Sequence, residues 1–145
     1  MEIYTIGFTQ KRAAQFFGTL REAGVEQLVD VRLNNVSQLA GFTKRDDLEF
    51  FLSELCGAAY LHESLLAPTQ ALLDSYKKKH LPWSEYADRF LQLMADRRIE
   101  DKLDPMIFEM RTVLLCSEPT AERCHRRLVV EYLDKTWGGV RAVHL

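Results

Sequence analysis

The sequence has no long apolar run, few cysteines and no excess of positive charge. No stretch approaches the roughly 20 apolar residues that a membrane-spanning helix needs, and the first residues, MEIYTIG, lack the charged-then-apolar pattern of a signal peptide. The net charge of −2 creates no overall positive field, so charge gives no support to binding of nucleic acid or of an anionic membrane. We therefore expect a soluble protein without a membrane partner.

Cysteine is also scarce, with three residues in the whole chain. Their irregular spacing fits free thiols in a reducing compartment better than a disulfide scaffold. The length of 145 residues is that of one ordinary domain, and no repeat, low-complexity tract or linker divides it. We therefore expect a single cytoplasmic domain over residues 1–145.

Strand-like and helix-like segments alternate along the chain. The expected strands, rich in apolar and β-branched residues, are 3–6, 27–32, 112–116 and 140–144, with a shorter candidate at 58–61. The expected helices, which have apolar residues at helical spacing, are 9–23, 43–56, 70–79, one from 84 and one from 119. The expected N-caps are Thr9, Thr43, and Ser117 or Glu118. This alternation predicts a single-domain α/β fold, in which a parallel or mostly parallel sheet carries helices on both faces, as in a Rossmann-like three-layer sandwich.

The segment VLLCSEPTAERCHRR, residues 113–127, contains the densest group of reactive side chains. An apolar run ends at Cys116, and a helix is expected to follow it, with Arg126 about two turns from the helix start. In open α/β sheets, ligands bind where the carboxyl end of a strand faces a helix N-terminus. The sequence therefore predicts a site at this junction.

Cys116 has two interpretations. A thiol beside a helix N-terminus and arginines is activated as a nucleophile, whereas free cysteine is also among the most buried residue types and often only packs. The C-x5-R signature of cysteine-dependent phosphatases is absent, because Glu122 stands where that signature requires arginine. Cys56, beside a glycine at a helix end, is expected to be structural.

Cys124 and His125 follow within the same segment. Cys124 is expected to pack on the apolar face of the helix, while His125 is either a base or ligand or a structural imidazole with a satisfied hydrogen bond. Together with Cys116 and His144 they are residue types that bind zinc. No C-x2-C or H-x3–5-H spacing supports such a site, so no metal is expected.

Asp30 and Arg32 interrupt an apolar strand at its carboxyl end, where a charge is costly unless paired. Alternation along a strand would send their side chains to opposite faces. Either they form structural ion pairs, with a helix terminus or with Arg126, or Asp30 acts as a base while Arg32 binds an anion through two hydrogen bonds. Gly7, after the first strand, would allow a ligand to approach the backbone closely.

Three separated segments carry a family resemblance: TIGFT at 5–9, LVDVR at 28–32 and LLCSEPTAERCHR at 114–126, followed by a terminal VHL. With these motifs in the same order and spacing, the chain resembles the bacterial and archaeal domain-of-unknown-function family 488 over essentially its whole length. The resemblance implies an α/β domain whose motif residues surround one polar pocket. Those residues are Gly7, Phe8, Thr9, Asp30, Arg32, Cys116, Glu118, Cys124, His125 and Arg126.

The chain departs from the family pattern at two places. The family often has His or Tyr where Phe8 stands, so a polar group is expected to be missing from the pocket rim. It also often has proline shortly after the Asp-x-Arg pair, where this chain reads Asn34-Asn35-Val36. We therefore expect that loop, and any substrate specificity it sets, to differ.

The leading functional hypothesis is an enzyme that acts on a phosphorylated or otherwise anionic substrate, such as a nucleotide or a nucleic-acid component. Arg32 and Arg126 would hold the anion, and Cys116 would be the nucleophile. The general base would be Asp30 or Glu118. Gly7, Phe8, Thr9 and His125 complete the expected substrate-binding set.

Two alternatives remain open. The same residues could form a non-catalytic anion-binding or adaptor domain, or Cys116 and Cys124 could form a redox sensor, which needs their Cα atoms within ~7 Å. The sequence identifies no cofactor, substrate or oligomeric state. It does predict that Asp30, Arg32, Cys116, Glu118 and Arg126 converge on one pocket, with a carboxylate–arginine contact under ~4 Å.

Overall fold

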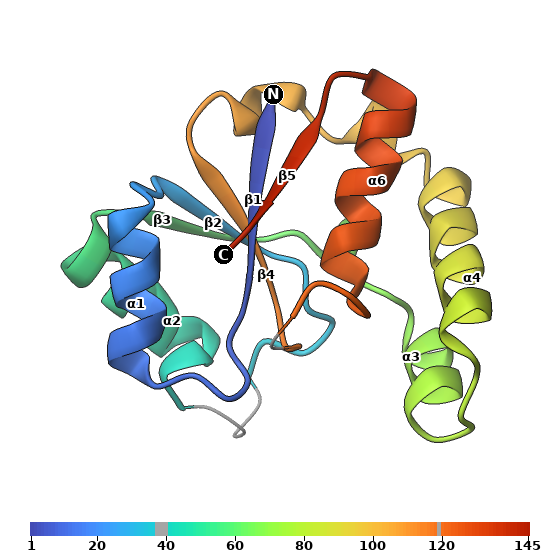
Figure 1. Ribbon diagram of the computed structural model, residues 1–145, viewed down its shortest axis with the longest axis horizontal. Helices are drawn as coiled ribbons and strands as arrows, with labels where there is room; N and C mark the ends of the chain where they lie inside the picture. Colours follow the sequence, from blue (N-terminus) through green and yellow to red (C-terminus); the bar gives the residue numbers. More distant parts are fainter. Residues whose placement is uncertain (37–40, 119) are drawn as a thin grey trace.

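Five parallel strands form one sheet in the computed structural model, which describes residues 1–36, 41–118 and 120–145. The strands are β1 (Glu2–Gly7), β2 (Gln27–Asp30), β3 (Ala59–His62), β4 (Thr112–Cys116) and β5 (Arg141–His144). Their order across the sheet is β3-β2-β4-β1-β5, and every neighbouring pair is parallel (Figure 1). The predicted α/β fold is confirmed.

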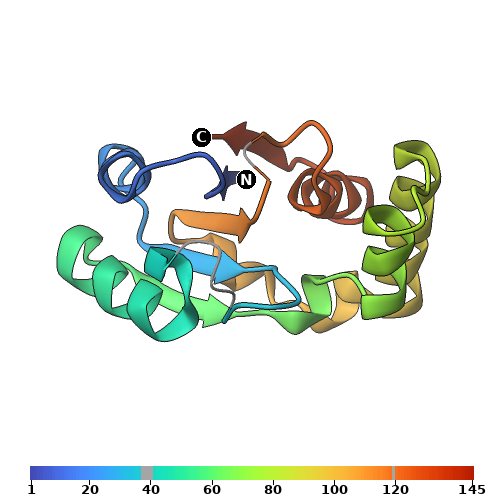
Figure 2. The ribbon, with the colours of Figure 1, turned by 90° about the horizontal axis from the view of Figure 1, so that it is seen from below.

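Helices cover both faces of the sheet (Figures 1 and 2). On one face lie α1 (Ala13–Glu22) and α2 (Arg45–Phe51), which continues as a π-helical turn over Leu52–Cys56. On the other face lie α3 (Gln70–Lys77), α4 (Trp83–Asp96), α5 (Ile99–Lys102) and α6 (His125–Trp137). None of the described helices is both long enough and apolar enough to cross a membrane.

The strand β4 runs through the centre of the sheet and is buried along its whole length. Val113 and Leu115 pack in the cluster beneath α1 and α2, together with Phe16. Leu114 and Cys116 belong to the cluster beneath α4 and α6. Successive side chains of a strand point to opposite faces, so this alternation fixes Cys116 on the α6 side of the sheet.

Two helices on the α1 face begin later than the sequence predicts. The N-cap of α1 is Arg12 rather than Thr9, whose hydroxyl instead donates to the carbonyl of Ser117. The N-cap of α2 is Lys44, without a side-chain cap, because Thr43 is buried in the preceding 3₁₀ turn over Gly41–Thr43. Both threonines therefore contribute to tertiary structure instead of capping a helix.

The start of α6 also differs from the prediction, and this difference changes the site. The helix begins at His125 with Cys124 as its N-cap, so Ser117 and Glu118 lie in the preceding loop and cap nothing. The predicted first helical residue, 119, lies outside the described residues. Arg126 consequently stands in the first turn of α6, not two turns into it.

The middle section follows the prediction closely. The helix α3 ends at Lys77, and α4 begins directly after Pro82. Thr69 caps α3, because its Oγ1 accepts a hydrogen bond from the backbone N–H of Leu72 at 3.1 Å. The two helices bring their aromatic side chains beside the carboxyl ends of the strands.

Candidate functional site

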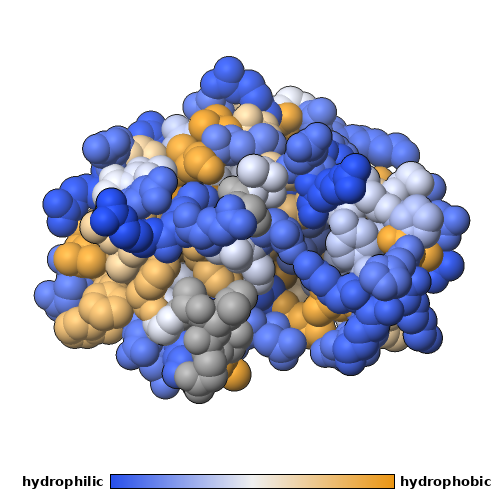
Figure 3. Space-filling model, turned by 60° about the horizontal axis from the view of Figure 1, so that its bottom comes forward, coloured by the Kyte–Doolittle hydropathy of each residue, from blue (hydrophilic) through white to orange (hydrophobic). Residues whose placement is uncertain are grey.

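A cavity of about 330 Å³ lies at the carboxyl ends of β2 and β4. Cys116 and the loop after β4 contribute to its lining, with the residues that follow β2, the helices α3 and α4, and the start of α6. Figure 3 turns this edge of the molecule forward, and hydrophilic side chains dominate its right side, over α3 and α4. The cavity thus occupies the position at which open α/β sheets bind ligands.

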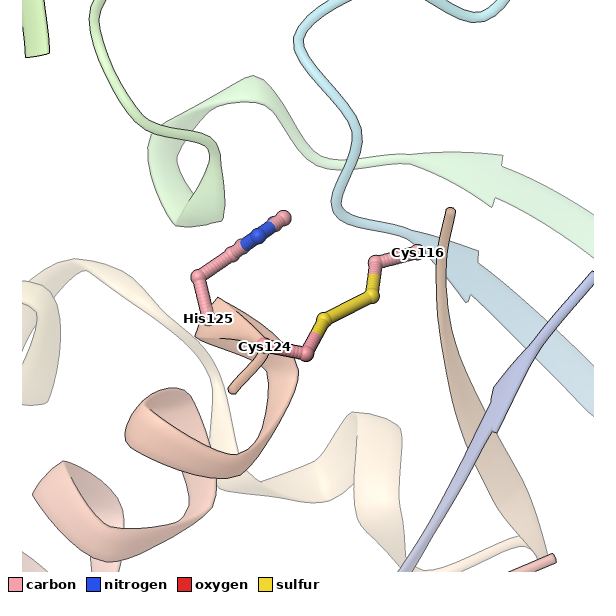
Figure 4. Close-up of side chains that lie close together, drawn as sticks. All are labelled: Cys116, Cys124 and His125. Carbon is pink, nitrogen blue, oxygen red and sulfur yellow. A yellow bond between two sulfur atoms is a disulfide. The ribbon is translucent and has the colours of Figure 1, made fainter. Parts of the chain in front are cut away.

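Cys116 and Cys124 lie together in this cavity and are joined as a disulfide (Figure 4). This bond corrects the expectation of free thiols at both positions. Their Cα atoms are 7.5 Å apart, slightly more than the separation of ~7 Å expected for a redox pair. The third cysteine, Cys56, is free, and burial raises the pKa of its thiol.

Arg126 is fully buried directly behind the two sulfur atoms. Its NH1 group lies 3.2 Å from the Sγ of Cys116 and donates to the carbonyl oxygen of Glu118 at 2.7 Å, while its Nε has no partner. Burial lowers the pKa of the guanidinium to about 10, so it stays protonated at neutral pH. Among the described residues it has no ion-pair partner, so the structural alternative that paired Arg126 with Asp30 is wrong.

His125 lines the cavity beside the cysteines. Its Nε2 donates a hydrogen bond to the backbone carbonyl of Val31 at 2.8 Å, which leaves Nδ1 as an acceptor. Burial lowers the pKa of the imidazole to about 4, so the ring is neutral at physiological pH. His125 therefore serves as a neutral hydrogen-bonding group and is a weak base.

Three potential metal ligands converge at this point. Cys116, Cys124 and His125 each offer a ligand atom, and these atoms lie within 4.8 Å of one another. Two cysteines and one histidine form a known type of catalytic zinc site, but the cation of Arg126 already stands beside one sulfur. The buried positive charge of Arg126 would repel a zinc ion and would stabilise a thiolate. These residues are therefore better suited to thiol chemistry than to metal binding. His144 is not part of this group among the described residues.

Asp30 and Arg32 form a buried ion pair with each other. Arg32 donates from Nε and NH2 to the two carboxylate oxygens of Asp30, both at 2.8 Å. This contact confirms the predicted carboxylate–arginine pair, although its members are Asp30 and Arg32 themselves rather than a helix terminus or Arg126. The strand ends at Asp30, so the strict alternation that would separate the two side chains no longer applies.

This ion pair limits what Asp30 can do. Its Oδ2 also accepts a hydrogen bond from the hydroxyl of Tyr60 at 2.7 Å, and the carboxylate is fully buried outside the cavity lining. Arg32 does line the cavity, but its NH2 is further committed to the carbonyl of Thr43 at 2.7 Å. Asp30 is therefore a poor candidate for a general base. The ion pair between Asp30 and Arg32 instead stabilises the loop after β2.

Tyr60 and His62, both on β3, were not identified from the sequence. Burial, with the carboxylate of Asp30, raises the pKa of the Tyr60 hydroxyl, which stays a proton donor. The Nε2 of His62 lies 2.9 Å from the backbone carbonyl of Arg32. Only the short apolar candidate strand at 58–61 indicated that a strand would lie here.

Gly7, Phe8 and Thr9 do not line the cavity, although the resemblance places them in the pocket. A Cβ at Gly7 would lie 1.5 Å from the carbonyl oxygen of Glu118, so the close backbone approach is made by the protein itself and not by a ligand. The backbone N–H of Thr9 donates to the carbonyl of Ser117 at 3.1 Å. These contacts hold the loop that follows β4.

Phe8 has a packing role in the structure. It is 2% exposed, belongs to the apolar cluster beneath α1, and lies under the guanidinium of Arg32, whose Cζ is 5.3 Å from the ring centre. The departure from the family pattern at this position therefore lies in the core and not at the cavity rim.

Charged side chains surround the mouth of the cavity. The carboxylate of Glu118 and the ammonium group of Lys77 form a partly exposed ion pair at 2.7 Å. Arg123 also lines the cavity, is exposed, and has no ion pair with a described residue. Exposed ion pairs contribute little to stability and exchange partners easily, so this mouth can receive an anion.

An aromatic wall closes one side of the cavity. It consists of Tyr76 on α3 with Trp83 and Tyr86 on α4. The ring centres of Tyr76 and Tyr86 are 4.7 Å apart, and those of Trp83 and Tyr86 are 5.4 Å apart. This wall was not identified from the sequence, in which the aromatic residues of the two expected helices at 70–79 and from 84 are the only signal of it.

The predicted site residues are thus brought together in part. Arg32, Cys116, Glu118 and His125 line one cavity, Arg126 lies behind Cys116, and Asp30 lies behind Arg32. The chain matches, over residues 12–133, the model of a family described as a domain of unknown function, DUF488. Comparisons with curated proteins and with solved structures found no match.

Proposed function

The chain belongs to the DUF488 family, whose description assigns no activity, and from this premise we propose that it is a thiol-dependent enzyme acting on a small anionic substrate. The nucleophile is the thiolate of Cys116 in the reduced protein. A reducing compartment such as the cytoplasm fits this function, because the disulfide with Cys124 blocks the thiol.

One observation carries the proposal, the position of the buried Arg126. Its guanidinium lies 3.2 Å from the Sγ of Cys116 and has no carboxylate partner among the described residues. A buried charge is unfavourable unless an opposite charge compensates it. When the disulfide is reduced, a thiolate at Cys116 supplies that charge, so Arg126 favours the reactive form of the thiol.

Two features support an anionic substrate. The first turn of α6 begins at the cavity, and its N-cap Cys124 makes no side-chain hydrogen bond to the first backbone amides. These amides carry the partial positive charge of a 13-residue helix. The side chain of Arg123, which has no ion pair with a described residue, adds a full charge at the rim.

The proposed reaction is a nucleophilic displacement. The thiolate of Cys116 attacks an electrophilic centre of the substrate, a bond from sulfur to that centre forms, and the leaving group departs with its electron pair. Water then attacks the same centre and releases the thiolate, after losing a proton to the carboxylate of Glu118 at the cavity mouth. His125 stays neutral and offers Nδ1 as a hydrogen-bond acceptor.

The test compares two alkylating reagents on protein reduced with dithiothreitol. Iodoacetate is anionic and iodoacetamide is neutral, so the ratio of their rates at Cys116 reports whether the cavity concentrates anions. We expect Arg123→Gln to lower this ratio several-fold and phosphate to protect Cys116. The control is Arg89→Gln, which removes the same charge from an exposed position on α4 outside the cavity.

An inert Cys116 thiol at neutral pH would contradict the enzyme proposal and favour a non-catalytic binding domain. An unchanged ratio in Arg123→Gln would contradict the anionic substrate. Mass spectrometry of the labelled peptides separates Cys116 from Cys56, which lies outside the cavity.

A second candidate function, thiol redox sensing, is favoured by the disulfide between Cys116 and Cys124. Its reduction by a dithiol consumes two electrons and two protons and gives two thiols. The substitution Cys124→Ser tests this second candidate, because it removes the disulfide partner of Cys116. If the pair is the sensor, the variant loses its functional response to oxidant, and a response that persists in the variant would contradict this candidate.

A further inference from the structure

The aromatic wall has polar atoms that no described residue uses. Tyr86 is only 3% exposed, yet its hydroxyl makes no hydrogen bond to a described residue, and the same holds for the indole N–H of Trp83 and the hydroxyl of Tyr76. Tyr76 and Trp83 are partly exposed, and the Tyr86 hydroxyl is not among the buried polar atoms that lack a partner, so these groups can be reached from outside the protein core. Because all three line the cavity, these groups are available to a ligand.

The wall is also fixed in place. Trp83 stacks on Tyr86 with an angle of 26° between the rings, and the guanidinium of Arg127 lies 5.7 Å from the centre of the Trp83 ring. Arg127 is in turn held by Glu131, one turn further along α6, at 3.0 Å. A rigid surface of aromatic rings loses little conformational entropy when a flat ligand packs against it.

The cavity therefore combines two chemistries. Its aromatic wall offers ring surface with hydrogen-bonding groups that no described residue uses, and its lining also includes Arg123 and the start of α6 with its first amides. A volume of about 330 Å³ is at the lower end of the range of small-molecule sites. Such a site fits one planar ring joined to one anionic group.

We propose that the cavity binds a nucleoside monophosphate. Its base packs against Tyr76, Trp83 and Tyr86, and its phosphate lies at Arg123 and the start of α6. For the part of the cavity that binds the phosphate, this assignment rests on the proposed function. It names the substrate class of that function. The small volume and the net charge of −2 favour a mononucleotide over a nucleic-acid strand.

The experiment measures binding by calorimetry to the reduced full-length protein, with AMP, adenosine and inorganic phosphate as separate probes. We expect AMP to bind at least tenfold more tightly than either adenosine or phosphate, because only AMP engages both the aromatic wall and Arg123. Arg123→Gln should weaken AMP binding about tenfold and leave adenosine binding unchanged. Arg89→Gln should change neither.

Fluorescence locates the base. The chain has two tryptophans, and Trp137, the last residue of α6, packs against Phe108 and does not line the cavity. AMP should quench the emission of the wild type, and this quenching should disappear in Trp83→Phe. Quenching that persists in Trp83→Phe would place the nucleotide elsewhere and overturn the proposal.

Two further outcomes would also overturn it. AMP binding no tighter than phosphate binding would mean that the wall does not recognise the base, and tighter binding of a single-stranded oligonucleotide would indicate a nucleic-acid ligand. The calorimetry separates this inference from the enzyme proposal, because AMP binding is measured without any reaction at Cys116. An inert Cys116 and a failure to bind AMP are therefore independent results.

Discussion

At the scale of single residues, the site depends on charges that the fold buries. Arg126 has sulfur atoms and a backbone carbonyl as neighbours instead of a carboxylate. Arg32, by contrast, is fully paired with Asp30. These two arginines, which the sequence assigns to the same anion-binding role, therefore differ in function: one sets the charge around Cys116, and the other holds a loop.

The Asp30–Arg32 pair gives a prediction about stability. Asp30→Asn removes the carboxylate and leaves Arg32 charged and 4% exposed, which should cost about 3 kcal/mol in the free energy of unfolding. The control is Asp46→Asn, which breaks the exposed pair with Arg45 and should change stability by less than about 0.5 kcal/mol. Urea denaturation measures both. Equal effects of the two substitutions would show that the buried pair is not structural.

His125 gives a prediction about pH. Its pKa is lowered to about 4 in the folded protein, so as the pH falls below the ordinary histidine value of ~6.5 the unfolded chain takes up the proton first. The stability that neutral His125 contributes is therefore complete above that value and is lost as the pH falls towards 4, by about 3 kcal/mol at most.

The measurement is urea denaturation of the wild type and of His125→Gln between pH 7 and pH 5. The stability difference between the two proteins should shrink as the pH falls. The same substitution at the exposed His80 controls for the loss of one histidine. Curves that stay parallel for the wild type and His125→Gln would contradict the burial of a neutral imidazole.

At the scale of elements, the junction between β4 and α6 is held in place by contacts with another segment of the chain. The loop after β4 is fixed by the end of β1 and the residues after it, through the contact of Gly7 with Glu118 and the hydrogen bonds of Thr9 to Ser117. This explains why the TIGFT and LLCSEPTAERCHR segments belong together although they are far apart in the sequence. The first segment positions the second and makes no contact with the cavity.

Gly7 tests this packing directly. Gly7→Ala places a methyl group where the carbonyl oxygen of Glu118 stands, so the loop must shift, and we expect a loss of at least about 2 kcal/mol in stability. Gly18 in α1 is the matched control, because nothing lies within 4 Å of its added Cβ. Gly18→Ala should stabilise the protein by about 0.5–1 kcal/mol. If thermal unfolding showed no loss for Gly7→Ala, the contact between the two segments would not be tight.

The strands were predictable from the sequence, whereas the starts of α1, α2 and α6 were not. β4 was evident because a strand buried on both faces shows an unbroken apolar run. The start of α6 was misplaced because Ser117 and Glu118 have the composition of a cap, while their actual contacts, with Thr9 and Arg126, are tertiary. Local composition does not reveal such competing partners.

At the scale of the whole molecule, the sheet brings together residues from all three motif segments. The carboxyl ends of β1, β2 and β4 lie side by side, which is why Gly7, Asp30 and Cys116 are neighbours. The sequence predicted this convergence from the parallel sheet. It could not reveal the aromatic wall, because α3 and α4 reach the cavity only through the packing of α4 on α6.

The central claim is that Arg126 holds Cys116 as a thiolate, and the pH dependence of alkylation tests it most directly. The rate of reaction of Cys116 with iodoacetamide is measured from pH 5 to pH 10 in reduced protein carrying Cys56→Ser and Cys124→Ser, with and without Arg126→Met. We predict a midpoint well below the value of about 8.5 for an ordinary cysteine, and an upward shift of at least about one pH unit in Arg126→Met. A midpoint at or above the ordinary value in the protein that retains Arg126 would contradict the account, whether or not the variant folds.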